Sequence, residues 1–542
     1  MLKHLFYIYC IFLFLCGISI SAQNKTEFYR WNEQKNSYEF DFYSQDKIKA
    51  LDSLATIGFY TLQIDSIKAD KIYLNKGKNF KNIWVKNETI FKNQDFNPTN
   101  NLDSILSKYI EEQDKNGFSF TNVQLIPHGN IKDEQKIELK LNLGVQRKID
   151  AVKSVGYTKL SKGYILHGLG LKKGKIYNES VLANASSVMQ NTNYIVQLQE
   201  PQTLFRPDST IIYLYPKKVK SNTFDGILGF GNDENGDFKL NGNVQLEMNN
   251  IFNGLEQIRL NWIGTANKNT TLDIRVKLPY LFKSPIGSET QFKLFKQDSV
   301  FVNLDLNERL FYQINPNSSL GANLSYTTSN YLLDDESFAK NYDDFNKTGI
   351  GLSYEYFVRH PFQLMEGKSL LRVFASSIKK KEKNFSLTEE IVNENSKQYE
   401  IGLETYRIFQ FYKKHYLKGA VSFKTLLDEN DLLSENELYR IGGFGSIRGF
   451  NEESIIANLY GIGSLEYRFL PNEGFYVSVF GDYAFIDNKR MDLNTNFISF
   501  GTGLSFMTKI GIFNLSYAVG KTENTPFDFK ESKIHFGILS QF

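Results

Sequence analysis

The chain of 542 residues carries 63 lysines and arginines against 60 aspartates and glutamates. This balance gives no support for nucleic-acid binding, which needs an excess of positive charge. Aromatic residues make up 15% of the chain, with 45 phenylalanines and 31 tyrosines. Beyond residue 22 no apolar run reaches the length of about eighteen residues that a membrane-spanning helix needs. An aromatic-rich chain without such a run has one other way into a bilayer, the closed β-barrel.

The first 22 residues have the pattern of a secretory signal peptide. A basic start precedes an apolar run from Leu5 to Cys16, and small residues then lead to Ala22, where we expect cleavage. A lipoprotein anchor on Cys16 is the alternative, although Leu15 is bulkier than such sites prefer. The only two cysteines, Cys10 and Cys16, lie in this segment, so we expect a mature protein without a disulfide or a thiolate metal site.

Helix and strand patterns alternate between residues 23 and 219. Apolar residues at helical spacing predict helices near residues 48–55, 102–110 and 181–189. Two strand-like runs follow each helix, and the unit recurs about every seventy residues. The pattern predicts two or three α/β modules in tandem, with boundaries at 23–78, 79–146 and 147–219.

The third of these segments is the most complete. A strand near residues 147–157, a short helix from Ser161 to Leu169 and a loop precede the long helix, and two strands follow it. This order resembles a POTRA domain, the periplasmic module of outer-membrane assembly and translocation barrels. A generic α/β domain explains the same pattern, so this segment alone leaves both interpretations open. A basic linker, Tyr215 to Asn222, ends the region.

From residue 220 onwards the alternation is of strand type almost to the end of the chain. Segments of roughly ten residues recur and are separated by turn clusters rich in asparagine, proline and glycine. This pattern predicts a transmembrane β-barrel over residues 220–542. The last strand alternates apolar residues and ends on the aromatic Phe542, which resembles the recognition signal at the end of outer-membrane barrels.

Two segments allow the faces of the barrel wall to be assigned. In the first, the odd-numbered residues from Ala457 to Phe469 are apolar or small, and in residues 475–485 a similar apolar face recurs. Because lipid must contact the apolar face, the polar residues between them point into the lumen. The inward-pointing charged residues are then Glu466, Arg468 and Asp482.

The segment IGGFGSIRGF, Ile441 to Phe450, lies between two strand patterns and therefore in a long connection. Its glycines permit the backbone conformations of a sharply folded loop. If Arg448 folds back into the lumen, it meets Glu466 and Asp482 on neighbouring strands. The planar guanidinium suits this role because it can bind a carboxylate through two hydrogen bonds. A solvated loop arginine is the alternative.

These motifs resemble those of the BamA/TamA superfamily of outer-membrane insertion and translocation proteins. The loop is similar to the superfamily's VRGF motif, with Ile447 in place of valine, and EYRFLP and FGDYAF are similar to its two acidic strands. The resemblance implies that the loop tucks into the barrel and that Arg448 pairs with the two acids. The residues that it assigns to this loop lock are Arg448, Gly449, Phe450, Glu466 and Asp482.

The resemblance also implies a fold class of tandem POTRA-like α/β domains followed by a 16-stranded antiparallel transmembrane β-barrel. Sixteen strands share residues 221–542, which leaves about twenty residues for each strand and its connection. The protein would lie in the outer membrane with its modules in the periplasm.

No other motif in the sequence points to a different chemistry. The six histidines are scattered, and neither H-E-x-x-H nor G-x-S-x-G occurs, so the sequence does not indicate a zinc or serine hydrolase. The acidic run from Asp334 to Asn346 lacks the ligand spacing of a calcium loop, and we expect a solvated loop there. We therefore expect no catalytic residue, no metal, no cofactor and no enzymatic activity.

The resemblance implies a protein that assists insertion or translocation of other proteins at the outer membrane. Its expected partners are the lipid bilayer and client outer-membrane or secreted proteins, with a periplasmic accessory protein as a further candidate. Clients would add to edge strands of the modules, and the barrel would part where the first strand, around Gly226 to Gly231, meets the last, around Lys533 to Phe542. The alternatives are a two-partner-secretion-like translocator of a dedicated exoprotein and a passive pore or structural barrel.

Overall fold

The computed structural model describes residues 26–541, except for residues 60, 61, 81, 132, 133, 193, 233–237, 265–268, 333–341, 363, 366, 386–390, 431, 432, 509, 510 and 524. The predicted signal peptide and Phe542 lie outside the described residues, as does most of the acidic run. The chain forms two compact units, the first made of residues 1–148 and 176–179 and the second of residues 149–175 and 180–542. In the described part, no helix has the length and apolar character required to cross a membrane.

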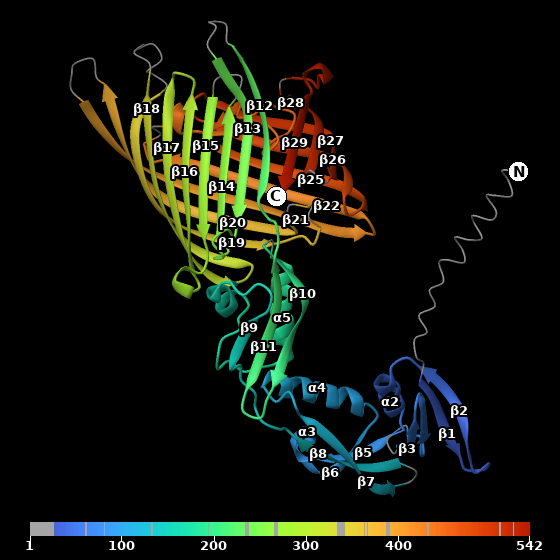
Figure 1. Cartoon of the computed structure of the whole chain (residues 1–542). Helices are drawn as coiled ribbons and strands as arrows, with labels where there is room; N and C mark the ends of the chain where they lie inside the picture. Colours follow the sequence, from blue (N-terminus) through green and yellow to red (C-terminus); the bar gives the residue numbers. More distant parts are fainter. Residues whose placement is uncertain are drawn as a thin grey trace, which may run out of the picture. The chain divides into compact units, whose positions relative to one another are not determined.

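The first unit holds two α/β modules of related topology (Figure 1). The elements of the first module are β1 (Thr26–Asn32), β2 (Ser37–Ser44), α2 (Lys47–Thr56), β3 (Gln63–Lys68) and β4 (Lys71–Asn75). Those of the second are β5 (Ile83–Asn87), α3 (Glu88–Phe91), β6 (Asn93–Thr99), α4 (Leu102–Lys115), β7 (Asn122–Ile131) and β8 (Glu134–Asn142).

Both sheets place a parallel pair of strands at the centre and antiparallel strands at the edges. The strand order is β2-β1-β4-β3 in the first module and β6-β5-β8-β7 in the second. Phe28, Ile72 and Leu74 face α2 and are fully buried, because every second side chain of a strand points to the same face. Among the described residues, the edge strands are β2 and β3 in the first sheet and β6 and β7 in the second.

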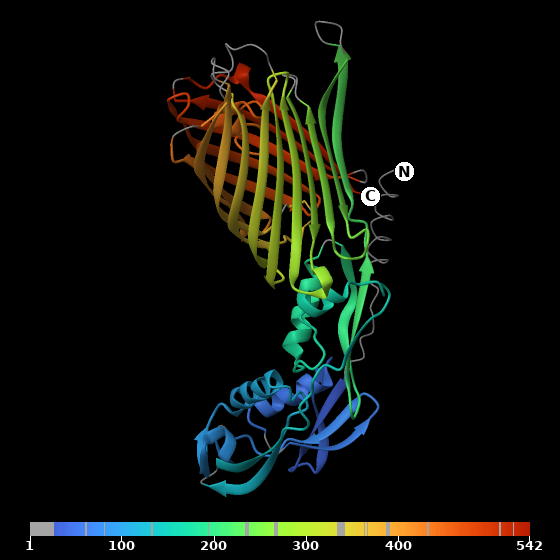
Figure 2. The same cartoon turned by 90° about the vertical axis from the view of Figure 1, so that its left-hand side faces the viewer.

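The third module belongs to the second unit, apart from the short segment 176–179. Its elements are β9 (Ala151–Ser154), η1 (Tyr164–Gly168), α5 (Glu179–Gln190), β10 (Ile195–Phe205) and β11 (Thr210–Lys218). The strand order is β10-β11-β9, with a parallel pair between β11 and β9. Figure 2 shows α5 on one face of the β10–β11 hairpin.

Two turns of the barrel contact this module. The Tyr157 hydroxyl donates to Asn253 Oδ1 at 2.7 Å and accepts from Asn250 Nδ2 at 3.1 Å. Tyr280 lies directly against Gly163, where an added Cβ would come within 2.6 Å of the tyrosine Cβ. Glycine at position 163 therefore permits the close approach of the two parts.

The barrel contains sixteen strands in one closed antiparallel sheet (Figure 1). They are β12 (Thr223–Asn232), β13 (Phe238–Asn249), β14 (Gln257–Gly264), β15 (Asn269–Leu278), β16 (Ile286–Gln297), β17 (Phe301–Asn315), β18 (Ser318–Tyr331), β19 (Asp344–Val358), β20 (Ser369–Phe385), β21 (Ile391–Tyr412), β22 (His415–Asp428), β25 (Leu459–Asn472), β26 (Phe475–Asn488), β27 (Leu493–Met507), β28 (Gly511–Thr522) and β29 (Lys533–Gln541). The predicted fold class is confirmed.

The barrel closes through a short seam between its first and last strands. Within the described residues, β12 and β29 form three residue pairs, which join Thr223–Asp225 to Leu539–Gln541. By comparison, β28 and β29 form eight pairs and β12 and β13 form ten. The seam is therefore the weakest of these three ladders.

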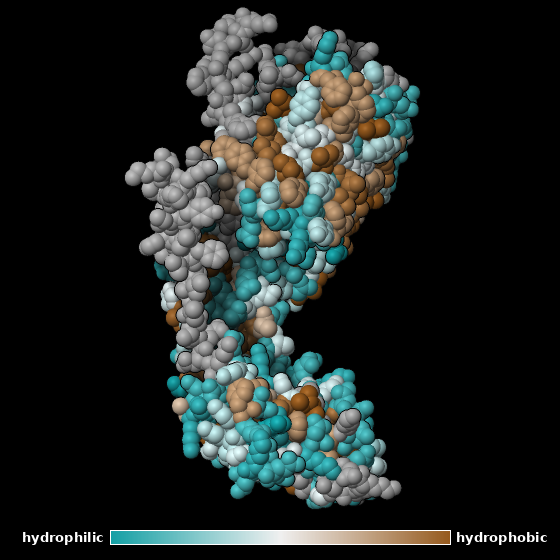
Figure 3. All heavy atoms as spheres, turned by 90° about the vertical axis from the view of Figure 1, so that its right-hand side faces the viewer, coloured by the Kyte–Doolittle hydropathy of each residue, from teal (hydrophilic) through white to brown (hydrophobic). Residues whose placement is uncertain are grey.

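Apolar side chains gather on the outer wall of the barrel (Figure 3). Leu465, Val479 and Tyr483 are exposed, whereas Glu466 and Asp482 are buried on the inner side, as the alternation predicts. The prediction was wrong at Ala457, which does not lie on the lipid face. It belongs to the short strand β24 (Ile455–Ala457) and is fully buried, because the wall strand begins only at Leu459.

Candidate functional site

The connection between β22 and β25, residues 429–458, folds into the barrel, and we call it the lumenal loop. It contains a short helical turn, η3 (Glu435–Glu437), and a hairpin of β23 (Tyr439–Ile441) with β24. The loop bonds to inward-facing residues on both sides of the lumen: the backbone carbonyl of Asn436 accepts from Asn303 on β17, and the Arg448 side chain donates to Glu466 on β25. The sequence placed this segment in a connection but did not reveal the hairpin.

An apolar cluster packs the loop against the inner wall. Ile447, the residue just before Arg448, is fully buried in it. The other buried members are Ile441, Ile455, Ala457, Tyr460, Ile462, Ala484, Ile486 and Phe497. Burial of each large aliphatic side chain contributes about 1.5–3 kcal/mol, so this core, shared by the loop and the wall strands β25, β26 and β27, helps to hold the loop in place.

Arg448 binds both predicted carboxylates at once. Its Nε and Nη2 donate to the two oxygens of Asp482 at 2.9 and 2.6 Å, and its Nη1 donates to Glu466 Oε2 at 2.8 Å. Nη2 also donates to the Ser464 hydroxyl at 2.9 Å. The guanidinium lies over the Phe480 ring, 3.4 Å from its centroid. The structure thus brings together the loop arginine and both acids.

The site is largely closed to solvent. The side chains of Arg448, Glu466 and Asp482 are 13%, 7% and 1% exposed. Burial lowers the pKa of Arg448, but the hydrogen bonds and charge of Asp482, together with the charge of Glu466, outweigh burial and raise it. The guanidinium therefore remains charged. Glu466 also accepts from Arg468 Nε at 2.7 Å, so a second cation neutralises the pair of carboxylates.

Gly449 and Phe450 hold the loop against β28. Gly449 has a φ of +86°, and an added Cβ would lie 2.9 Å from the backbone of Gly520. Phe450 covers Gly520 and meets the Phe497 ring edge-on, with 5.2 Å between the centroids. Both positions therefore serve close packing: glycine for the left-handed backbone, and phenylalanine for contact with a glycine of the wall.

A second ionic anchor, which sequence reasoning missed, holds the other end of the loop. Glu437 binds the ammonium groups of Lys347 on β19 and Lys380 on β20, the latter at 2.8 Å. Its Oε1 also accepts the backbone N–H of Ser434 at 2.6 Å, which closes a capping box around η3. The motif Ser-x-x-Glu at 434–437 was the available sequence signal; nothing in the sequence pointed to the two lysines as its partners.

The environment of Glu437 keeps it ionised. Burial raises the pKa of this carboxyl, but the charges of Lys347 and Lys380 outweigh burial and bring the pKa down to about 2. Gln398 adds a hydrogen bond of 2.9 Å from its amide nitrogen. The lumenal loop is thus held by salt bridges to β19 and β20 at one end and to β25 and β26 at the other.

A polar cavity of about 1340 Å³ lies where the third module meets the barrel. Tyr164 and Tyr194 of the module line it together with barrel residues of both charges, among them Arg259, Glu355 and Arg372. Among the described residues, no cluster of three or more His, Cys, Asp or Glu is arranged to hold a metal ion.

The Arg448 contacts generate a first prediction. The changes Arg448→Glu and Asp482→Arg, made singly, are each expected to cost about 3–5 kcal/mol, because each leaves buried charge without its partner. Arg448→Lys keeps the charge but loses the two-pronged bond and is expected to cost less. The measurement is the temperature at which the purified barrel loses its compact electrophoretic mobility, together with protease cleavage within residues 429–458.

The exposed Lys413→Glu serves as the control and is expected to change neither readout. If both single changes at the site behave like this control, Arg448 does not hold the loop.

The second prediction concerns Glu437. Its pKa of about 2, against an ordinary value of 4.5, means that ionisation stabilises the docked loop above pH 4.5 and that this contribution is lost as the pH falls through about 2. Glu437→Gln is therefore expected to lower the free energy of unfolding by about 3 kcal/mol near neutral pH. The difference should shrink between pH 4.5 and pH 2.

Denaturant unfolding of both proteins across this pH range is the measurement, with the exposed Glu473→Gln as the matched control. A difference that stays constant with pH would contradict the assigned ion pairs.

Comparison with known proteins identifies a family and structures of similar fold. A family model described as the Omp85 superfamily domain matches residues 250–542, more than half of the chain. CdiB from Escherichia coli is similar at 12% identity over 91% of this chain and 96% of its own, with a TM-score of 0.52. CdiB from Acinetobacter baumannii is similar at 15% identity over 84% of each chain, with the same TM-score.

BamA from Haemophilus ducreyi lacking POTRA domains 1–3 aligns at 16% identity over 85% of this chain and 99% of its own, with a TM-score of 0.47. No match was found among curated proteins. At such identities the CdiB structures show a shared fold alone, whereas the family match covers the lumenal loop with Arg448 and the strands that carry Glu466 and Asp482. The chain belongs to the Omp85 superfamily of outer-membrane barrels.

Proposed function

We propose that this protein assists the insertion of other proteins into the outer membrane, with its modules in the periplasm. The observation that carries the proposal is the seam, where β12 and β29 share three residue pairs within the described residues. In lipid an unpaired backbone group costs several kcal/mol, because no water is present to bond it. Beyond Asp225, β12 keeps its pairs with β13 but forms no pair with β29 among the described residues, so this side of the strand offers the edge that an incoming strand needs.

The interior of the barrel supports this assignment. The lumenal loop ties β19 and β20 to β25 and β26 through buried ion pairs, so the wall away from the seam is held together from within. A barrel braced in this way can part at its short ladder while the remaining strands keep their register. The opening would be lateral, toward lipid, where the client strand belongs.

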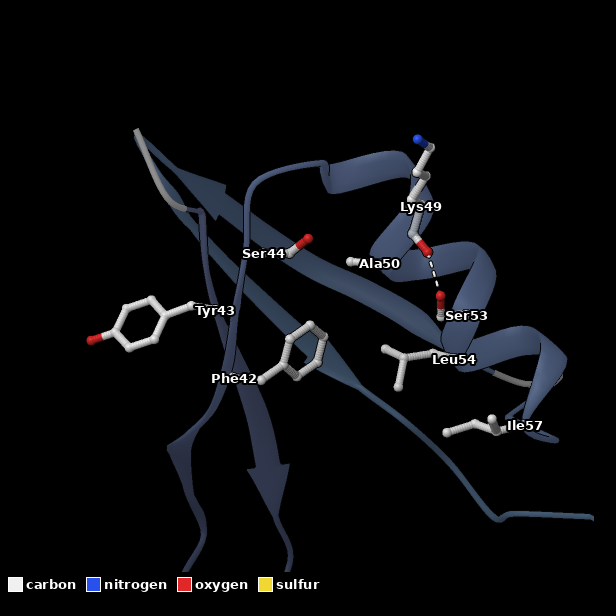
Figure 4. A pocket seen from close by; sticks show the side chains of 8 residues that line it. All are labelled: Phe42, Tyr43, Ser44, Lys49, Ala50, Ser53, Leu54 and Ile57. Atoms are coloured by element: carbon white, nitrogen blue, oxygen red, sulfur yellow. Dashed lines mark hydrogen bonds between the residues drawn. The ribbon is translucent and has the colours of Figure 1, made fainter. Parts of the chain in front are cut away.

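The modules would receive clients by strand addition. β2 is an edge strand, and an apolar groove lies between it and α2 (Figure 4). Phe42 points into this groove toward Leu54, whereas Tyr43 points away from it (Figure 4). A client strand of any sequence could form main-chain hydrogen bonds with β2, and the groove would accept its apolar side chains.

In this proposal the protein is not an enzyme and needs no cofactor. The free energy comes from the client, because each strand that pairs within the bilayer satisfies its own backbone groups. A periplasmic accessory protein, if it exists, would act at the modules.

Translocation of a secreted protein through the lumen is the second candidate. The cavity of about 1340 Å³ between the third module and the barrel favours it, because it offers a wide polar entrance. The lumenal loop would then have to leave its two anchors in every transport cycle. The two functions thus differ in which element must move, the seam or the loop.

Thiol crosslinking of the seam and of the loop separates these functions. Phe224→Cys with Ser540→Cys joins directly opposed residues of the seam, and Asn436→Cys with Ser329→Cys ties the loop to β18. With a short bifunctional thiol reagent, the seam crosslink is expected to abolish most client insertion into vesicles, and the loop crosslink is expected to leave it in place. The mature chain is expected to contain no competing thiol, since its two cysteines precede residue 22.

The pair Ser505→Cys with Asn514→Cys joins β27 to β28 and controls for rigidity added elsewhere in the wall. Full insertion with a closed seam would refute the proposal. Loss of secretion with the tied loop alone would favour the translocator.

A further inference from the structure

Three lysines lie close together on the outer wall of the barrel, away from the lumenal site. Lys379 and Lys381 are on β20, and Lys397 is on β21. All three side chains are exposed, whereas Ile378, Lys380 and Glu382 between and beside them are buried on the inner side. We call these three residues the lysine patch.

The strand register brings the patch to one place on the wall. Lys379 lies directly opposite Lys397, and Lys381 is two residues further along the same face. Like charges directly opposite each other on a sheet are destabilising. In the part of the chain that the structure describes, no ion pair joins any of the three to a carboxylate. Within these residues, the positive charges of the three ammonium groups are therefore not neutralised by an ion pair.

Two carboxylates share this face but have other partners. Asp344 accepts the backbone N–H of Tyr331 at 2.6 Å, and Glu429 accepts the hydroxyl of Tyr399 at 3.0 Å. Glu429 lies beside Lys397, to whose carbonyl its backbone N–H donates at 3.0 Å, so it marks the β22 side of the patch. The rows that contain Lys379 and Lys381 hold only uncharged neighbours from β19, namely Thr348 and Asn346. The centre of the patch is therefore positive and polar.

The lysine patch adjoins a group of exposed apolar side chains on β19 and β21. One row closer to the third module, Ser377 lies between Ile350 and Tyr399, and the next row contains Leu352 and Ile401. Ile350 and Leu352 are each 65% exposed, as lipid-facing residues are. β20 runs away from the third-module cavity, which its residues Leu370 and Arg372 line. The lysines therefore lie at the membrane boundary remote from the third module.

We propose that the lysine patch binds the phosphate groups of an anionic lipid in the leaflet remote from the third module. Phosphate fits because several ammonium groups can share its oxygens, and the apolar rows below the patch accept the acyl chains. The assignment of the leaflet rests on the proposed membrane orientation; the binding itself does not. A lipid held at β20 and β21 would fix the depth of the barrel on the wall that its own loop braces.

The test uses the purified full chain in nanodiscs of phosphatidylcholine, titrated with lipopolysaccharide whose lipid A carries its phosphates. Lys379→Gln, Lys381→Gln and Lys397→Gln together are expected to weaken binding roughly 10- to 100-fold, since each surface cation contributes severalfold. The three Lys→Arg changes are expected to retain binding. Lys217→Gln, Lys413→Gln and Lys414→Gln, which remove the same charge from other exposed positions, are expected to have no effect.

Dephosphorylated lipopolysaccharide should bind to the wild type as weakly as phosphorylated lipopolysaccharide binds to the Gln variant. Inorganic phosphate should compete with the lipid only at far higher concentration. Equal affinity of the Gln variant and the wild type would overturn the proposal, as would full competition by inorganic phosphate at lipid concentrations. Unchanged compact electrophoretic mobility of the variant shows that the barrel is intact. Client insertion is measured separately, so a failed insertion proposal leaves lipid binding unaffected, and the reverse also holds.

Discussion

Two carboxylates buried on neighbouring strands inside a barrel are stable only if a cation is brought to them. Asp482 and Glu466 lie on β26 and β25, and Arg448 reaches both from the lumenal loop. The short distances follow from this requirement, because each charged group has lost its hydration and only direct hydrogen bonds to the opposite charge can compensate for that loss. The position of Arg448 then fixes the residues around it: Ile447 in the apolar cluster, Gly449 beside β28 and Phe450 on Gly520.

The same loop is held at a second place by a different geometry. Glu437 is one anion between two ammonium groups on β19 and β20, the reverse of one guanidinium between two carboxylates. Together the anchors connect strands that are not neighbours in the wall. The seam of β12 and β29 is short by comparison, with three residue pairs. The strongest tertiary contacts thus lie in the lumen, and the shortest ladder lies where the barrel closes. That distribution is what a barrel that opens toward lipid requires.

Along the outer wall of the barrel, the exposed side chains change from apolar to basic. Exposed isoleucine and leucine side chains give way, within one row of the sheet, to the lysine patch. A membrane imposes such a boundary because hydrocarbon meets charged headgroups over a few ångströms. The inner and outer faces of β20 are thus both basic for different reasons: Lys380 serves the loop anchor, and Lys379 and Lys381 face the lipid boundary.

Features that depend on local periodicity could be predicted from the amino-acid sequence. Alternation of period two fixed which side of β25 and β26 carries Glu466 and Asp482, and glycines around Arg448 indicated a folded loop. Features that depend on contacts between distant parts of the chain could not be predicted in this way. Ala457 continued the alternating pattern but belongs to the β23–β24 hairpin, and Glu437 finds Lys347 across 90 residues of sequence. The length of the seam depends on the register of strands from opposite ends of the barrel, and strand periodicity repeats in every register that differs by two residues. Closure of the barrel selects one of these registers, which no local pattern can do.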